Sequence, residues 1–218
     1  MTFALSQLYT FLKAFLTGIL ISIGGIVFMS CDNKYIGAFL FGTGLFTILT
    51  FGLDLFTGKV GYVVNNKPRY LFYLLIVWLG NLTGTVLAAA LVRFTRFYEP
   101  LKEKAQTIIS AKTSDNLMSL LVLGFFCGML MFIAADGYKN IENNIAKVCA
   151  IFLPVMVFII AGFEHSIADM FYISMAESWD TNTIIRILII SAGNALGGIF
   201  IPLIRKCEPK KSEEKKHA

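Results

Sequence analysis

The chain of 218 residues alternates between long stretches without charge and short polar connections. A helix needs about 20 mostly apolar residues to cross a bilayer. Six charge-free stretches approach or reach that length, at residues 14–31, 35–53, 70–92, 116–135, 148–163 and 187–204. The pattern therefore predicts an all-α integral membrane protein with six transmembrane helices.

The second and fifth stretches are interrupted by charge and then continue. The second runs past Asp54 to Thr57, and the fifth runs past Glu164 and His165 to Met175. A charged residue near the middle of a span is costly and is rarely exposed to lipid. We therefore predict that the second and fifth helices are broken near the middle of the bilayer.

The two halves of the chain resemble each other. Residues 80–84 (GNLTG) match residues 193–197 (GNALG), and residues 52–54 (GLD) are echoed by residues 162–164 (GFE). Three spans per half would place the halves in opposite orientations. We predict a channel domain at residues 1–204, built as a 3+3 inverted repeat with halves at about 13–96 and 116–204, an arrangement that places solutes near the bilayer midplane. The GxxxG spacing itself favours close helix packing.

The composition fits a membrane protein. Hydrophobic residues make up 56% of the chain, charged residues 15%, and the mean hydropathy is +0.71. Charged residues make up about a quarter of a typical soluble domain. This chain could not cover its surface in water, which excludes a cytosolic enzyme, a secreted domain and a disordered chain.

The net charge of +5 is unevenly placed. An even number of spans places both chain ends on one side, and twelve of the nineteen basic residues then lie on that side. Basic residues favour the cytoplasm, so we predict cytoplasmic termini, with residues 205–218 as a disordered basic tail. Five of the other basic residues lie in the loop at 93–115. We interpret this loop as a mouth that attracts anions.

Titratable groups inside a span are candidates for function. Glu164, His165 and Asp169 form the strongest cluster, and Asp54 and Thr57 lie in the other break. The cluster could line a pore or form a structural polar network. It could also belong to a membrane-embedded enzyme or an ion-binding scaffold.

The sequence offers little for a metal or a cofactor. It contains no HExxH motif and no closely spaced cysteine pair, and its only other histidine, His217, lies in the tail. We predict no metal site, no cofactor and no enzymatic activity. Bulky apolar residues flank the two breaks, where they could gate a pore, although such residues are more often simply core: Phe41, Leu45, Leu55, Phe56 and Phe158.

Three segments resemble the formate/nitrite transporter family: residues 54–58 (DLFTG), 78–81 (WLGN) and 162–171 (GFEHSIADMF). The resemblance extends over residues 13–204. It implies an aquaporin-like fold of six helices and a homopentamer with one pore per protomer in the cytoplasmic membrane of a prokaryote. Membrane lipid is then an expected partner and nucleic acid is not. The expected solutes are small monovalent anions of weak acids: formate first, then nitrite or hydrosulfide.

The resemblance also assigns roles by position. His165 resembles the central pore histidine of the family, Glu164 its neighbour, and Thr57 the threonine that faces the histidine. Lys112 and Lys147 resemble lysines that attract anions at the two mouths. The apolar constrictions correspond to Leu45, Phe158, Phe41, Leu55 and Phe56, and the supporting positions to Asp54, Asn194 and Asp169.

Two positions depart from the family pattern. Gly128 and Asp169 both stand where the family usually has asparagine, which removes a hydrogen-bond partner from the expected polar relay. We expect His165 to donate a hydrogen bond or a proton to the anion, because the idealised cost of desolvating a bare anion is on the order of 20 kcal/mol. The anion could cross alone or together with a proton.

Overall fold

The structure is a computed structural model that describes residues 3–208, and all regular elements within that range are helical. The predicted all-α fold is confirmed. The elements in chain order are α1 (Phe3–Ser30), α2 (Lys34–Thr50), α3 (Phe56–Lys59), the 3₁₀ helix η1 (Val60–Asn65), α4 (Tyr70–Val92), α5 (Tyr98–Ser114), α6 (Leu117–Asn140), α7 (Asn144–Ala161), α8 (Ser166–Met175) and α9 (Thr181–Lys206).

Five helices of the described residues are long and apolar enough to cross a membrane, namely α1, α4, α6, α7 and α9. The prediction was six spans, and the one missing from these five is the second. Its helix α2 is apolar but has only 17 residues before the chain breaks. The first helix also begins earlier than predicted, at Phe3. Lys13 lies inside this helix, and its charge is paired with the Asp54 carboxylate, 3.2 Å from its ammonium.

Both predicted helix breaks are present. After α2 the chain turns at Gly52, with φ of 60°, and helix resumes at Phe56. After α7 it turns at Gly162, with φ of 74°, and α8 begins at Ser166. A left-handed backbone conformation favours glycine because other residues have a Cβ that clashes there. The two glycines therefore end the first half-helices, and the residues after them form the centre of the molecule.

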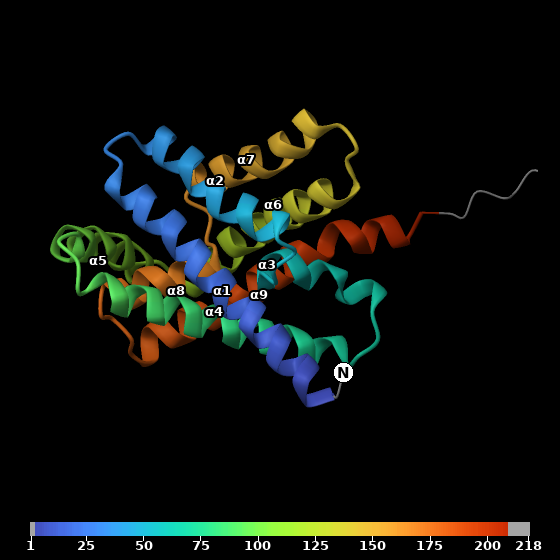
Figure 1. The fold of residues 1–218 in the computed structure, drawn as a ribbon, viewed down its shortest axis with the longest axis horizontal. Helices are drawn as coiled ribbons and strands as arrows, with labels where there is room; N and C mark the ends of the chain where they lie inside the picture. Colours follow the sequence, from blue (N-terminus) through green and yellow to red (C-terminus); the bar gives the residue numbers. More distant parts are fainter. Residues whose placement is uncertain (1–2, 209–218) are drawn as a thin grey trace, which may run out of the picture.

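The helices of the two halves pack in the same pairs. In Figure 1, α1 lies against α4 and α6 against α9, while the broken helices α2 and α7 lie side by side. A Cβ at Gly84 would lie 2.0 Å from the carbonyl oxygen of Phe15, and one at Gly197 would lie 1.8 Å from that of Phe125. The GxxxG glycines thus let the helix backbones touch, as the packing interpretation of this spacing expects.

The predicted loop at 93–115 is mostly helical. Its helix α5 buries Leu101, Ala105 and Ile109, which are four residues apart and so lie on one face. Figure 1 shows α5 at one end of the molecule, with the start of α1 and the end of α9 at the other. Within the predicted tail, Arg205 and Lys206 belong to α9, and residues 209–218 lie outside the described range.

Candidate functional site

The two helix breaks meet at a threonine and a histidine. Thr57 lies in the first turn of α3, and His165 precedes the first residue of α8. The threonine Oγ1 and the histidine Nε2 are 2.9 Å apart, and the two residues are 0% and 2% exposed. The structure therefore brings together the two residues that the sequence placed at the centre of a pore.

The other ring nitrogen fixes the tautomer of His165. Its Nδ1 accepts a hydrogen bond of 3.1 Å from the backbone N–H of Ala168. In a neutral ring one nitrogen accepts and the other donates, so the hydrogen is assigned to Nε2. The Nε2–H then donates to Thr57 Oγ1, which leaves the threonine O–H free to donate in its turn.

Two asparagines hold the breaks in matching ways. The Asn81 side chain on α4 donates to the carbonyls of Ala14 and Asp54 and accepts from the N–H of Phe56. The Asn194 side chain on α9 donates to the carbonyls of Gly124 and Glu164 and accepts from the N–H of Ser166. These six bonds measure 2.8–3.0 Å. Each asparagine replaces helical bonds that the break removes, and each ties the break to a continuous helix.

A cavity lies on each side of this centre. The α5-side cavity has a volume of about 470 Å³ and is lined by His165, Phe158, Lys34 and Lys112, among others. The termini-side cavity has a volume of about 510 Å³, and its lining includes Leu45 and Leu55 together with the residues Lys59, Lys139, Tyr62, Tyr70, Tyr73 and Tyr138. Small anions such as formate occupy far less space than either cavity.

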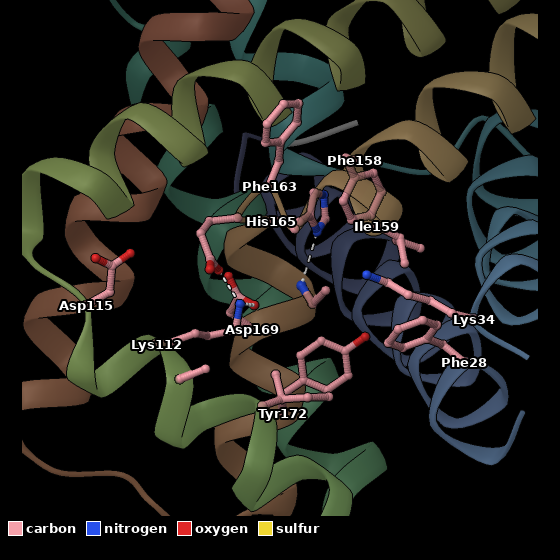
Figure 2. A pocket seen from close by; sticks show the side chains of 15 residues that line it. Phe28, Lys34, Lys112, Asp115, Phe158, Ile159, Phe163, His165, Asp169 and Tyr172 are labelled. Carbon is pink, nitrogen blue, oxygen red and sulfur yellow. Dashed lines mark hydrogen bonds and ion pairs between the residues drawn. The ribbon is translucent and has the colours of Figure 1, made fainter. Parts of the chain in front are cut away.

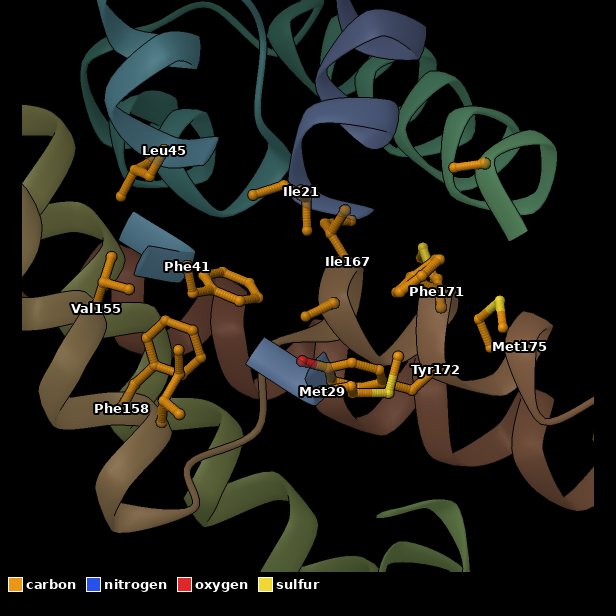
Figure 3. Packing of buried hydrophobic residues seen from close by; sticks show 14 of the residues in the cluster. Ile21, Met29, Phe41, Leu45, Val155, Phe158, Ile167, Phe171, Tyr172 and Met175 are labelled. Atoms are coloured by element: carbon orange, nitrogen blue, oxygen red, sulfur yellow. The ribbon is translucent and has the colours of Figure 1, made fainter. Parts of the chain in front are cut away.

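Apolar side chains separate the two cavities. The rings of Phe41 on α2 and Phe158 on α7 meet edge to face with centroids 5.8 Å apart, and Phe158 stacks on His165 at 5.5 Å. Figure 3 shows the two phenylalanine rings facing each other, with Leu45 farther along α2. Phe56 lines a groove together with Trp78, and its part in a constriction stays a prediction.

Lys112 reaches from α5 into the lining of its cavity. Its ammonium pairs with the carboxylate of Glu164 and lies 2.9 Å from Oδ1 of Asp169. Figure 2 shows Lys112 and Asp169 next to each other. Burial opposes its charge, but Asp169 and Glu164 outweigh that effect and raise the pKa of Lys112 above its usual range. The lysine expected to attract anions is therefore paired with two carboxylates.

The termini-side cavity is bordered by a different charge cluster. Asp54 lies 3.2 Å from the ammonium groups of both Lys13 and Lys59, and it accepts a hydrogen bond from Tyr73. Lys147 lies over the ring of Tyr138, which lines this cavity, at 5.3 Å. Sequence reasoning missed Lys59 as a lining residue, although its place five residues after Asp54 was a usable signal.

The two departures from the family pattern have structural consequences. A Cβ at Gly128 would lie 2.1 Å from the carbonyl oxygen of Asn194, so α9 leaves no room for a larger residue there. Asp169 adds a second carboxylate beside Lys112. Within residues 3–208, no group of three or more His, Cys, Asp and Glu side chains is arranged to hold a metal ion.

A sequence model of the formate/nitrite transporter family matches residues 2–205. The chain belongs to the formate/nitrite transporter family. This family member is 31% identical to the uncharacterized transporter YwcJ of Bacillus subtilis (strain 168), over 91% of this chain and 88% of the relative. It is 28% identical to the formate channel FocA of Escherichia coli (strain K12), over 77% of this chain and 66% of that protein.

Solved structures share the fold of this family member. An FNT family ion channel aligns with a TM-score of 0.82 over 94% of this chain and 92% of the other. A pentameric formate channel with formate bound aligns with a TM-score of 0.78 over 94% and 98%. Both are 22% identical to this chain, so the likeness shows the fold. The resemblance stated from sequence is confirmed, and the protein is an integral membrane protein of a transporter family.

Proposed function

We propose that this protein passes small monovalent anions of weak acids between its two cavities, past Thr57 and His165. The observation that carries the proposal is the buried hydrogen-bonded pair itself, which lies where the two helix breaks meet. An anion that reached the pair would replace one hydrogen bond within the protein by two donated bonds, from the threonine O–H and from Nε2–H. Formate is the first candidate, followed by nitrite and hydrosulfide.

His165 acts in this proposal as a hydrogen-bond donor and not as a proton donor. Its Nδ1 faces the N–H of Ala168, and a second ring hydrogen there would set two donors against each other. A neutral ring that gave up its remaining hydrogen would become an anion in an apolar setting, which is strongly unfavourable. A proton that accompanies the solute is therefore taken up from water in one of the two cavities and not from His165.

The apolar barrier explains why weak acids are favoured. Phe41, Phe158, Leu45 and Leu55 are at most 4% exposed and offer an anion no polar partner. A neutral acid crosses such a barrier at much lower cost than its anion. Protonating an anion costs roughly 1.4 kcal/mol for each pH unit between the pKa of the acid and the ambient pH, which is modest beside the desolvation cost.

We also propose a homopentamer in the cytoplasmic membrane of a prokaryote, with both termini in the cytoplasm. A solved pentameric formate channel has the same fold, and the apolar groove lined by Phe56, Leu71 and Trp78 offers a face for a neighbouring copy or for lipid. Native mass spectrometry of the purified protein should give five times the mass of 24.2 kDa. A single copy under mild detergent conditions would contradict the assembly.

The transport proposal is tested on liposomes that contain the purified protein. Vesicles placed in salts of formate, nitrite or hydrosulfide should swell faster than protein-free vesicles, whereas sulfate, which is divalent, should produce no added swelling. The relative rates rank the substrates. If none of the three monovalent anions enters faster than in protein-free vesicles, the proposal is wrong, and the alternative of a membrane-embedded enzyme or ion-binding scaffold is favoured.

A further inference from the structure

The α5-side cavity ends on a buried group of charges. Glu164, which precedes His165, and Asp169 on α8 both contact the ammonium of Lys112. The side chains of these three residues are 7%, 3% and 16% exposed, respectively. We call these three residues, the two carboxylates Glu164 and Asp169 and the lysine Lys112 that joins them, the carboxylate triad. With all three groups ionised, the two carboxylates and the one ammonium give the triad a net charge of −1.

The triad is also short of one hydrogen bond. Oδ1 of Asp169 contacts Lys112, but the buried Oδ2 has no hydrogen-bond partner among the residues that the structure describes. A buried carboxylate oxygen without a partner is unfavourable, since a carboxylate in its ionised form only accepts hydrogen bonds. A protonated carboxyl group, by contrast, carries a hydrogen that can be shared.

Within residues 3–208, the neighbouring elements bring no further side-chain cation into contact with Asp169. Tyr172 on α8, Cys127 on α6 and the neutral His165 are its other titratable neighbours. Arg186 on α9 lies close by, but its guanidinium donates to the carbonyls of Lys112, Thr113 and Asp115 at the end of α5. Elsewhere on the cavity, the Lys34 ammonium donates to the Ile160 carbonyl.

Lys112 itself stays protonated and positively charged. Two carboxylates hold its pKa above the usual range in spite of burial. The surrounding side chains therefore do not supply the positive charge that would balance the triad. Water can supply it as a proton, because Glu164 and Asp169 line the α5-side cavity. A proton needs no added space, which suits a site this closely packed.

From this geometry we infer that the carboxylate triad is a binding site for one exchangeable proton, taken from water in the α5-side cavity and shared by Glu164 and Asp169. The triad is neutral with the proton and carries one negative charge without it. The termini-side cavity differs, because Lys139 lines it together with Lys59, which shares Asp54 with Lys13, and no carboxylate is among its lining residues in the described part of the chain. The proton therefore controls how readily an anion enters from the α5 side. This consequence rests on the proposed function, whereas the proton site does not.

Infrared spectroscopy of the purified full-length protein tests the proton site without any transport. A protonated carboxyl group has a C=O stretching band that a carboxylate lacks. At about pH 5 the wild type should show such a band, which should disappear by about pH 9. Asp169→Asn and Glu164→Gln should each lack it at both pH values, because in these variants Lys112 balances the one carboxylate that remains. The matched control is Asp115→Asn, which removes a carboxyl from the same cavity and should keep the band. Absence of the band from the wild type, or its survival in either triad variant, would overturn the site.

Transport gives the second arm of the test. The ratio of formate uptake in Asp169→Asn to that in the wild type cancels the protonation of formate itself. It should lie near one at about pH 5 and rise to about threefold or more at about pH 9, where the wild-type triad is charged. A ratio that stays constant with pH would refute the control of entry. If no formate enters either protein, the proposed function fails while the infrared result still decides the proton site.

Discussion

At the scale of the residue, the two asparagines are the least replaceable side chains of the centre. Asn81 and Asn194 are both 0% exposed, and each pairs two backbone carbonyls and one backbone N–H that lie at a helix break. Unpaired buried polar groups are costly in a protein interior. The asparagines therefore fix the position of Thr57 and His165 without touching either side chain.

Replacing Asn194 by Leu, which has a similar volume, should lower the free energy of unfolding by about 3 kcal/mol or more, because three buried groups lose partners at roughly 1–3 kcal/mol each. The measurement is the melting temperature in detergent. The matched control is Asn140→Leu at the exposed end of α6, where the side chain bonds only Asp136. Equal melting temperatures for the two variants would show that the Asn194 bonds contribute little.

The sequence predicted which residues lie at the centre better than it predicted what those residues contact. Asn194, Thr57 and His165 were among the expected site residues, whereas Asn81 was noted only as part of the GNLTG motif that matches GNALG. The partners of Lys112 could not be predicted, because they lie 52 and 57 positions away and depend on how α5 docks. The resemblance assigned Phe56 to a constriction, and in the structure Phe56 is among the residues that line the groove with Trp78.

At the scale of the element, α5 is attached to the rest of the protein by Glu177. The carboxylate of this residue contacts Lys102 and accepts a hydrogen bond of 2.8 Å from Tyr98, both on α5, and it lies 3.1 Å from Arg93. Glu177 has a positive φ of 54°, which is uncommon for a residue with a side chain. The link holds the helix that supplies Lys112.

Acid should weaken this link. The hydrogen bonds from Lys102 and then from Tyr98 hold the pKa of Glu177 below its ordinary value of 4.5. A carboxyl whose pKa is lower in the folded state adds stability above the pKa of the unfolded state and loses it as the pH falls through the folded value. Glu177→Gln should therefore melt at a lower temperature than the wild type at neutral pH, and the difference should shrink below about pH 4. A difference independent of pH would contradict the charge-based link.

The helix α5 also shows where pattern reasoning from the sequence stops. Its apolar residues Leu101, Ala105 and Ile109 recur at helical spacing, but basic residues surround them, so charge counting favoured an open loop. Lys104 donates to the carbonyl of Met29, and Lys102 pairs with Glu177. A basic residue attracts anions freely only when it lacks such partners, and partners are fixed by tertiary packing.

At the scale of the whole molecule, the two halves share a backbone plan but differ in charge. Asp54 lies between two lysines on one side of the centre, whereas Lys112 lies between two carboxylates on the other. A repeat in the sequence predicts the matching breaks and packing, which are seen. It does not predict this asymmetry, because Asp54 and Glu164 lie in matching motifs whereas their charged partners do not: Lys13, Lys59, Lys112 and Asp169.

The central claim is that anions pass through the protomer past Thr57 and His165. The most direct test is the rate of formate uptake into liposomes by Thr57→Val and His165→Phe, with Thr43→Val on the exposed face of α2 as the matched control. Each central variant loses one hydrogen-bond donor to a charged solute, worth about 1.5–3 kcal/mol, so uptake should fall at least about tenfold, while the control keeps the wild-type rate. Wild-type uptake in both central variants would show that the path lies elsewhere.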